Sequence, residues 1–385
     1  MNLENLLATI SLSLSLVALA LTLLNAATIW RPLPSMQLPS MQPSSTEGSR
    51  TVRINASILL PMRNEAKNVE PLISSISDAL QHEAGGIDWE VIALDDQSSD
   101  ETHHLLSQSQ TTLPQLRIMR GLDPETGWLG KPAAQHRLFL EAKNEYLVFV
   151  DSDVRIEPGS ITAAISTMEQ EGWDFISPYP RQIALTFLER LIQPLLQWSW
   201  FASVPLRLAA RFRINSMAVA NGQLFIVKRS ALAAIDGFAS VKSEILEDIE
   251  VARRLWVAGF KGSVVDGSAL AHCRMYESGK ELIDGYGKSL WRAFGSPFGA
   301  TLAITIMIAT SWLPLVMGVT GNPWGWLAYF AVSLSRLIAA LRTRSFWQSF
   351  LLHPISVALL TFMIVRSFIL KRKGALTWRD RSIAL

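Results

Sequence analysis

The stretch YLVFVDSDVRIEPG, from Tyr146 to Gly159, decides the fold class and raises the first chemical hypothesis. Five mostly apolar residues, typical of a buried strand, run directly into Asp151, Ser152 and Asp153. Two carboxylates one residue apart repel each other and raise each other's pKa, unless a cation or hydrogen-bond donors share the site. One interpretation is a surface turn after an edge strand, and the other is a divalent metal site at the carboxyl edge of a sheet. The D-x-D pair alone does not decide between them.

The residues on both sides of this stretch alternate between strand and helix patterns. Strands are expected in ASILLPM, WEVIALD, QLRIMRG, YLVFVDSDV and WDFISP. Helices are expected at 67–80, after Asp100 and Glu101, at 132–143 and from Pro158 onward. Strands that alternate with helices predict an α/β fold with a Rossmann-like, mostly parallel, doubly wound sheet.

Polar residues stand at four of the expected strand ends. They are Arg63, Asn64 and Glu65 after the first strand, Asp95 and Asp96 after the second, Asp151 and Asp153 after the fourth, and Pro178 and Tyr179 after the fifth. The carboxyl ends of parallel strands meet at one edge of a sheet, where ligands bind. Acidic residues at successive strand ends therefore favour the metal site over the surface turn. The dinucleotide and P-loop glycine motifs are absent from the sequence, which disfavours those enzyme classes.

Composition adds three constraints. The formal net charge of +2 is too small to indicate nucleic acid as a partner. The single cysteine, Cys273, excludes an intramolecular disulfide and fits a reducing compartment. Hydrophobic residues make up 49% of the 385 residues and there are 13 tryptophans, which points toward contact with lipid.

The N-terminal residues 1–30 are expected to form a transmembrane helix. Residues 5–30 carry no charge and are long enough to cross a bilayer, which takes roughly 20 residues. A signal peptide is the competing interpretation, but Glu4 is the only charge before the apolar run, so we favour a retained anchor. Arg31, Arg50 and Arg53 follow it and place the next segment in the cytoplasm. Residues 31–52, rich in Pro and Ser, are expected to be a linker.

The C-terminal part also contains membrane segments. After a domain expected at 53–297, residues 298–370 hold three apolar stretches, at 298–318, 324–341 and 346–365. Arg336 lies inside the second stretch, and His353 and Pro354 are expected to break the third. Three full spans would place the basic tail, 371–385, outside, against the positive-inside tendency, so one stretch is a candidate for a re-entrant or interfacial segment.

Residues 186–213 interrupt the α/β pattern. They are apolar, contain Trp198, Trp200 and Phe201, and end with Arg207, Arg211 and Arg213. Aromatic and basic residues together predict a helix lying in the membrane interface, and the alternative is a buried core helix.

Six motifs then carry a resemblance to a known family. LLPMRNEAKNVEPLISSI, ALDDQSSDET, GWLGKPAA, VFVDSDV, ANGQLFIVKRSAL and ILEDIEVARRLWVAGFKG occur in the order found in membrane-bound family 2 glycosyltransferases of the GT-A type. The chain most resembles those of bacterial carotenoid and hopanoid pathways, over about residues 55–295. The resemblance implies a nucleotide-sugar donor (a UDP- or GDP-sugar), Mg²⁺ or Mn²⁺, and inversion at the anomeric carbon.

The resemblance also implies residue roles. Asp248 would be the catalytic base, and Asp153 would ligate the metal, with Asp151 contacting the ribose or the metal. Asp96, together with Asp95, would bind the nucleobase and ribose; a turn or helix cap is the alternative for Asp95. The remaining donor-site candidates are Pro61, Arg63, Asn64, Glu65 and Lys131, the last as a phosphate contact or an ordinary solvated lysine.

A second group consists of weaker acceptor-side candidates, and its members are Glu247, Gln223, Trp198, Trp200, Trp291, Arg292 and His272. His272 is either a third metal ligand or, more commonly for a histidine, an ordinary hydrogen-bonded one. Polysaccharide synthases of this superfamily carry Q/R-x-x-R-W, whereas this chain has GYGKSLWRAFGS, with Trp291 before Arg292. Those two residues would contact sugar and phosphate, or anchor the chain at the interface.

The expected function is therefore inverting, metal-dependent transfer of a sugar to a hydroxyl of a membrane lipid, such as a carotenoid or another isoprenoid. The expected location is a bacterial inner, or thylakoid-type, membrane with the catalytic domain cytoplasmic. The alternatives are a polysaccharide synthase and an inactive membrane scaffold that keeps the fold.

Overall fold

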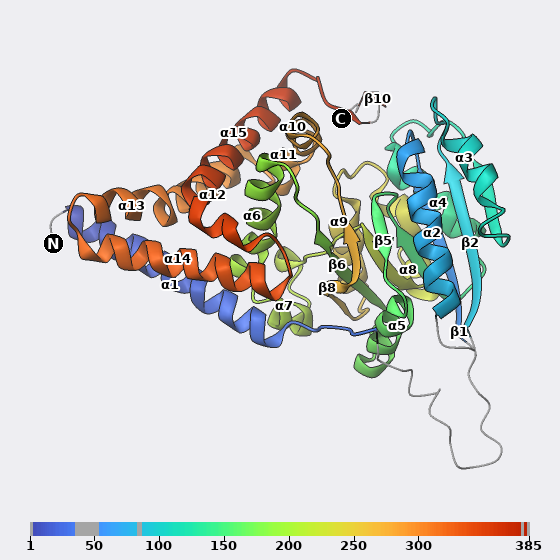
Figure 1. Cartoon of the computed structure of the whole chain (residues 1–385), viewed down its shortest axis with the longest axis horizontal. Coiled ribbons are helices and arrows are strands. Elements are labelled where there is room, and N and C mark those ends of the chain that lie inside the picture. Colours follow the sequence, from blue (N-terminus) through green and yellow to red (C-terminus); the bar gives the residue numbers. More distant parts are fainter. Residues whose placement is uncertain (1–2, 35–53, 83–86, 379–380, 383–385) are drawn as a thin grey trace, which may run out of the picture. The chain divides into compact units, whose positions relative to one another are not determined.

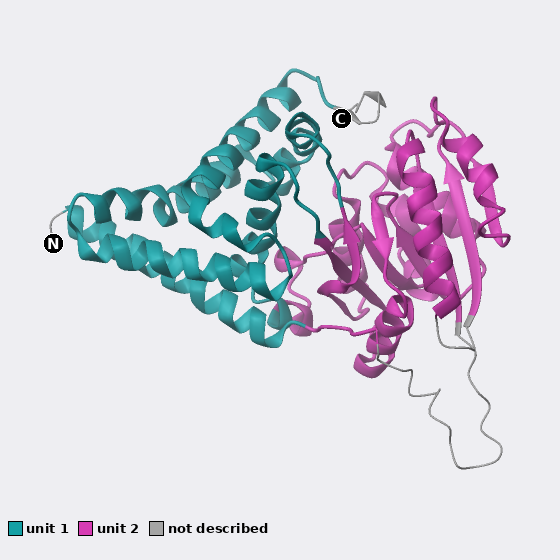
Figure 2. Ribbon diagram, in the orientation of Figure 1, with its two compact units in different colours: residues 1–29, 182–208, 274–385 teal, residues 30–181, 209–273 magenta. Residues whose placement is uncertain are grey.

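The computed structural model describes residues 3–34, 54–82, 87–378 and 381–382. Most of the predicted linker, with Arg50 and Arg53, lies outside the described residues. Two compact units are present (Figure 2). Unit 1 comprises Met1–Ile29, Gln182–Leu208 and Arg274–Leu385, and unit 2 comprises Trp30–Arg181 and Ala209–Cys273. The predicted domain 53–297 contributes residues to both.

The sheet of unit 2 holds eight strands of the described chain, in the order β3-β2-β1-β4-β7-β6-β8-β5. Figure 1 labels β1, β2, β5, β6 and β8 of this sheet. The strands are β1 Ile54–Met62, β2 Ile87–Asp95, β3 Leu116–Arg120, β4 Tyr146–Val150, β5 Val154–Ile156, β6 Phe175–Gln182, β7 Leu224–Lys228 and β8 Gly262–Cys273. Strands β3, β2, β1 and β4 pair in parallel, as predicted. Strand β7 pairs antiparallel with both β4 and β6, so the sheet is mixed.

The quoted stretch differs from the prediction at one point. The continuous strand expected over YLVFVDSDV ends at Val150, and Asp151 and Asp153 lie in the turn before β5, which pairs antiparallel with β8. All five residues of β4 are buried, and the strand lies inside the sheet between β1 and β7. A strand whose side chains are buried on both faces of the sheet is apolar without alternation.

Helices connect these strands. The helices of the α/β part are α2 Ala66–His82, α3 Thr102–Ser109, α4 Gly130–Glu141, α5 Ser160–Glu171, α8 Arg229–Ala234 and α9 Glu247–Val257, with short 3₁₀ turns η2 Asn215–Met217 and η3 Gly237–Val241. Pro158 was expected to open α5, but the helix begins at Ser160 after Gly159. Gly159 has φ +74°, and a side chain there would meet the carbonyl oxygen of Pro34 at 2.8 Å. Only glycine suits this position.

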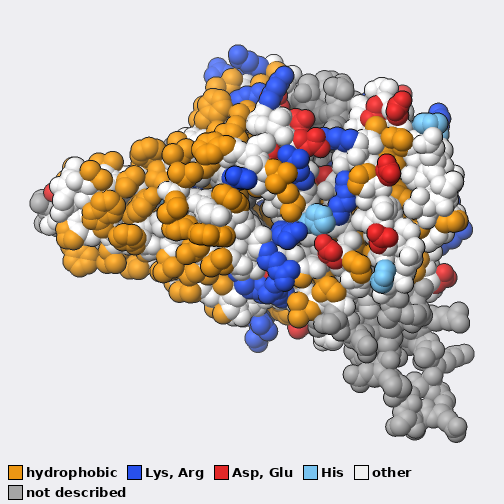
Figure 3. All heavy atoms as spheres, viewed as in Figure 1, with side chains coloured by type: hydrophobic (Ala, Val, Ile, Leu, Met, Phe, Trp, Pro, Cys, Tyr) orange, Lys and Arg blue, Asp and Glu red, His pale blue; other side chains and the backbone are white. Residues whose placement is uncertain are grey.

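Unit 1 is built from helices. They are α1 Leu3–Thr28, α6 Phe187–Ser203, α10 Gly279–Gly287, α11 Leu290–Ala293, α12 Pro297–Thr310, α13 Trp312–Val319, α14 Pro323–Arg342, η4 Trp347–Leu352 and α15 His353–Arg372, followed by a small ribbon of β9 Thr377–Trp378 and β10 Arg381–Ser382. Among the described residues, four stretches are long and apolar enough to cross a membrane, namely Leu3–Thr28, Pro297–Val319, Pro323–Arg342 and Trp347–Arg372. Hydrophobic side chains dominate the visible face of these helices (Figure 3).

Two predictions about these helices need correction. The single helix expected over residues 186–213 is two helices, α6 and α7 (Leu206–Phe212), because α6 ends at Ser203 just before Pro205. The third stretch changes at His353 and Pro354 from the 3₁₀ helix η4 to α15, where proline is tolerated in the first turn, but it stays one continuous helical stretch.

Two of the three aromatic residues predicted for the face of α6 are buried. Trp198 is 7% exposed and Phe201 is 3% exposed, and the indole N–H of Trp198 donates to Ser335 Oγ on α14. Trp200 is only partly buried. The burial of Trp198 and Phe201 fits the buried-helix alternative, and a position of the helix at the membrane interface stays a prediction.

Candidate functional site

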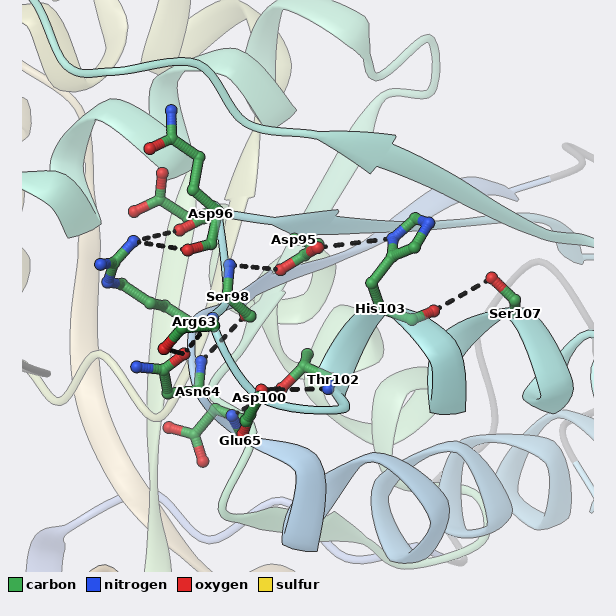
Figure 4. A network of polar contacts seen from close by, with 12 residues as sticks. Arg63, Asn64, Glu65, Asp95, Asp96, Ser98, Asp100, Thr102, His103 and Ser107 are labelled. Atoms are coloured by element: carbon green, nitrogen blue, oxygen red, sulfur yellow. Dashed lines mark hydrogen bonds and ion pairs between the residues drawn. The ribbon is translucent and has the colours of Figure 1, made fainter.

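The loops after β1 and β2 are tied together (Figure 4). Arg63 donates from Nη1 to the carbonyl oxygens of Asp96, at 2.6 Å, and Gln97, at 3.0 Å. Asn64, with φ +51°, accepts the backbone N–H of Ser99 on its Oδ1 at 2.8 Å. These two predicted donor-site residues therefore shape the loop that carries Asp96, and Pro61 lies in β1 in register with Leu94.

The two neighbouring aspartates of this loop differ in role. Asp95 accepts the backbone N–H of Ser98 at 3.0 Å, and its other oxygen lies 3.4 Å from His103 Nδ1 (Figure 4). Asp95 thus caps the turn, which was the predicted alternative. Asp96 packs on Gly121 after β3, where a side chain would come within 2.9 Å of Asp96 Oδ1. Gly121 was missed, although a glycine directly after a strand is a signal for close backbone approach.

Asp153 has an unsatisfied oxygen. Its Oδ1 is buried and has no hydrogen-bond partner. Burial, together with the nearby carboxylates of Asp151 and Glu65, raises the pKa of Asp153 to about 6. A buried carboxylate oxygen without a donor costs free energy unless a cation or another donor approaches it. This orphaned oxygen fits a divalent metal held by Asp153.

Cys273 and Gln223 support this aspartate. The thiol of Cys273, whose pKa is raised well above its usual value by burial and by Asp153, shares a hydrogen bond with Asp153. Gln223 donates from Nε2 to Cys273 Sγ at 2.9 Å, and its backbone oxygen accepts the N–H of Asp151 at 3.0 Å. Gln223 therefore positions the D-x-D turn. Cys273 was not predicted at the site, because the sequence places it 120 residues away from Asp153.

Lys131 bridges two carboxylates. Its Nζ lies 2.8 Å from Asp151 Oδ2 and 3.0 Å from Glu247 Oε1. Burial alone would lower the pKa of Lys131, but the carboxylates of Asp151 and Glu247 outweigh it and raise the pKa well above that of a free lysine. Lys131 is therefore charged and joins the D-x-D turn to α9. The predicted alternative of an ordinary solvated lysine is wrong.

Asp248 lies in the first turn of α9, next to Glu247. Its Oδ2 accepts the backbone N–H of Gly222 at 2.6 Å. Burial and the adjacent Glu247 raise the pKa of Asp248 to about 7, although Lys131 and two backbone N–H groups oppose the shift. A carboxylate with a pKa near 7 is partly ionised at neutral pH, which suits a general base.

The other predicted residues have contacts of their own. His272 Nδ1 is 3.0 Å from Glu157 Oε1, as expected for an ordinary hydrogen-bonded histidine. Trp198, Trp200, Trp291 and Arg292 belong to unit 1. The ring of Trp291 has Lys371 Nζ at 3.5 Å from its centre, so one face of this ring is already occupied by a cation.

Within the described chain, no three His, Cys, Asp or Glu side chains form a ready-made metal cluster. Beside a diphosphate, Mg²⁺ and Mn²⁺ typically take one or two carboxylates and complete their shell with phosphate oxygens and water. Asp153 and Asp151 together would supply two carboxylates.

Comparisons with known proteins identify the family of the domain that carries these residues. Residues 57–236 match the family described as Glycosyl transferase family 2, so the chain contains a glycosyltransferase family 2 domain. The match includes the D-x-D turn, Lys131 and Gly222, and it ends before α9.

Two curated relatives are similar. The dolichol-phosphate mannosyltransferase of Pyrococcus furiosus is 26% identical over 51% of this chain and 49% of its own length. The 4,4'-diaponeurosporenoate glycosyltransferase of Staphylococcus haemolyticus is 23% identical over 63% of this chain and 62% of its own. The chain thus spans about half the length of the first relative and less than two thirds of the length of the second.

A solved structure shares the fold. The mannosyltransferase of Pyrobaculum calidifontis, in complex with GDP-Man and Mn²⁺, covers 97% of this chain and 100% of its own, with a TM-score of 0.52 and 18% identity. The mixed sheet with its parallel half is therefore a GT-A-like fold.

Proposed function

We propose that this protein is an inverting, metal-dependent glycosyltransferase that moves a sugar from a UDP- or GDP-sugar to a hydroxyl group of a membrane lipid. The observation that carries the proposal is the charged cluster of unit 2. There, Lys131 joins the aspartate turn after β4 to Glu247, beside the raised-pKa carboxylate of Asp248.

The donor side rests on Asp153, Asp151 and the Asp96 loop. Asp153 and Asp151 would hold Mg²⁺ or Mn²⁺, which would neutralise charge on the departing diphosphate. The side chain of Asp96 would accept hydrogen bonds from the nucleoside. Arg63 holds Asp96 in place by donating a hydrogen bond to its backbone carbonyl oxygen. The Pyrobaculum mannosyltransferase, which shares the fold, was solved with GDP-Man and Mn²⁺, and this supports the choice of donor and metal.

The acceptor side rests on Asp248. Its carboxylate would accept the proton of the acceptor hydroxyl as the hydroxyl oxygen forms a bond to the anomeric carbon. The bond from that carbon to the diphosphate oxygen breaks on the opposite face, so the configuration inverts. The Gly222 N–H, bonded to Asp248 Oδ2, keeps the carboxylate oriented during the proton transfer.

A lipid acceptor and a membrane location are supported by the four apolar stretches of unit 1. The relatives named for dolichol phosphate and diaponeurosporenoate also act, by their names, on long isoprenoid-derived molecules. We place the catalytic residues on the cytoplasmic side, because Arg31 follows the first stretch and nucleotide sugars are cytoplasmic.

The two alternatives receive less support. A polysaccharide synthase would need the Q/R-x-x-R-W order, which this chain lacks. An inactive scaffold would not need an orphaned Asp153 oxygen or a carboxylate with a pKa near 7.

The test uses the purified full chain in lipid nanodiscs. UDP-glucose, UDP-N-acetylglucosamine and GDP-mannose are titrated with Mn²⁺ and with chelator, and lipid extracts of cells with and without the protein are compared by mass spectrometry. We expect metal-dependent binding of one donor and a lipid that gains one sugar only when the protein is present. Absence of binding for every donor, or equal transfer in chelator, contradicts the proposal.

A further inference from the structure

A buried arginine lies inside one of the candidate membrane spans. Arg336 belongs to α14 and is 2% exposed. Residues 297–378, which include three of the four candidate spans, contain no aspartate or glutamate. A charged side chain at such a position is costly and usually marks a function or a specific partner.

The partners of Arg336 in the described chain are neutral. Its Nη1 lies 3.1 Å from His353 Nδ1, and its Nη2 donates to Ser349 Oγ at 3.1 Å. Neither partner carries a negative charge. Arg336 forms no ion pair with an acidic side chain among the described residues, so they leave its positive charge uncompensated.

The same contacts leave two donors unsatisfied. A guanidinium can only donate, so His353 Nδ1 must accept, and the hydrogen of the neutral ring is then on Nε2. His353 Nε2 is buried without a hydrogen-bond partner, and so is Arg336 Nε. The Nε2–H of His353 points away from the guanidinium, because Nδ1 of the same ring faces it. The unpartnered Nε–H of Arg336, beside its positive charge, has the chemistry of an anion site.

The surrounding helices hold these groups in place. The ring of Trp198 on α6 packs edge-on against the His353 ring, with centroids 5.3 Å apart. Trp198 also donates to Ser335, which contacts Thr22 of α1 at 3.0 Å. The cluster therefore joins α1, α6, α14 and α15 and is not a frayed helix end.

We propose that Arg336 binds one anionic headgroup, a phosphate or carboxylate, of a membrane lipid, and that His353 holds the guanidinium in position for it. Arg336 stands six residues before the Arg342 end of α14, about 9 Å along the helix, within reach of a headgroup entering from that end. Phe330 and Leu334 of α14 are 63% and 47% exposed, so the ligand would approach from an apolar surrounding. The inference concerns a second site and does not depend on the proposed transfer reaction.

The test is native mass spectrometry of the full chain, delipidated in a neutral detergent. Phosphatidylglycerol, phosphatidylcholine and inorganic phosphate are added separately at equal concentration. The variants are Arg336→Met and His353→Phe, the latter keeping an aromatic ring against Trp198 while removing the Nδ1 acceptor that positions the guanidinium. Arg366→Met is the matched control, because Arg366 lies on α15 but already pairs with Asp284 at 2.6 Å.

We expect one tightly held phosphatidylglycerol on the wild type and on Arg366→Met, and at least tenfold weaker retention by Arg336→Met. His353→Phe should also weaken retention several-fold, and this variant decides the question if Arg336→Met does not fold. Equal retention of the two lipids, binding of inorganic phosphate in place of lipid, or unchanged retention in both site variants overturns the proposal.

Discussion

The backbone N–H of Gly222 donates a 2.6 Å hydrogen bond to Asp248 Oδ2, and a side chain at Gly222 would lie 3.3 Å from the same oxygen. The turn before β7 therefore touches the proposed base directly. The absence of a side chain at Gly222 is part of the geometry of Asp248.

Replacing Gly222 with alanine should displace this carboxylate by a few tenths of an ångström. We expect kcat to fall roughly ten- to hundredfold, because small misplacements of a reacting group are costly. Donor affinity, measured by titration calorimetry, should change little. A large loss of donor affinity or of folded protein would instead indicate that the alanine disrupts the turn.

Asp248→Asn should retain the donor and lose transfer. A positioned base contributes roughly 10²- to 10⁴-fold to the rate. Glu250→Gln is the matched control, because Glu250 lies on the same helix and pairs with Arg253. Transfer is measured with labelled donor and binding with unlabelled donor. If Asp248→Asn lost donor binding together with turnover, the role of Asp248 would be structural.

The raised pKa of Asp248 predicts two pH effects. Transfer should decline as the pH falls below about 7, because the base becomes protonated. The folded protein also holds this proton more tightly than the unfolded chain, where the pKa is 3.8. Without donor, the free energy of unfolding should therefore decrease as the pH rises from 3.8 toward 7, and Asp248→Asn should show a weaker decrease. Denaturant titrations at several pH values measure this difference, and identical slopes would argue against the shift.

Asp153→Asn should abolish metal-dependent donor binding, with at least a hundredfold loss of turnover. The fold should survive, since the substitution removes a buried charge whose Oδ1 has no partner. Asp88→Asn, at an exposed position of β2, controls for a general loss of negative charge. Binding of UDP or GDP with and without Mn²⁺ is the measurement. Equal Mn²⁺ enhancement in the variant and the wild type would exclude Asp153 as a ligand.

Lys131→Met should shift the pH dependence of transfer. Lys131 lowers the pKa of Asp248, so its loss should move the acid limb of the kcat/KM profile to higher pH. Lys131→Arg keeps the charge and should restore part of the wild-type profile. If Lys131 had only a structural role, Lys131→Met would reduce activity equally at all pH values, and the acid limb of the kcat/KM profile would not shift.

The sequence predicts the parallel half of the sheet well, because that half depends on local patterns. The buried residues of β4 and the polar residues after β1 and β2 could be placed from apolar runs and strand ends alone. The insertion of β7 between β4 and β6 could not, since it depends on pairing between segments about 80 residues apart, such as Val148 with Ile226.

The candidate site also contains residues that the sequence predicts and contacts that it does not predict. Asp153 and Asp248 were proposed from motifs, and the structure adds the raised pKa values and the orphaned oxygen. The bridge from Lys131 to Glu247 joins residues 116 positions apart, and nothing in the local sequence of either signals it. The same holds for the contact of Cys273 with Asp153.

Two backbone hydrogen bonds meet in the short turn that leads into β7. Gly222 donates to the proposed base, and the next residue, Gln223, accepts from Asp151 in the turn after β4. The span between the acid that would hold the donor and the acid that would activate the acceptor is thus set by main-chain atoms of two adjacent residues, the first of which must lack a side chain. Loops around the site can change to admit a different sugar or lipid while the distance over which the reaction must occur remains the same.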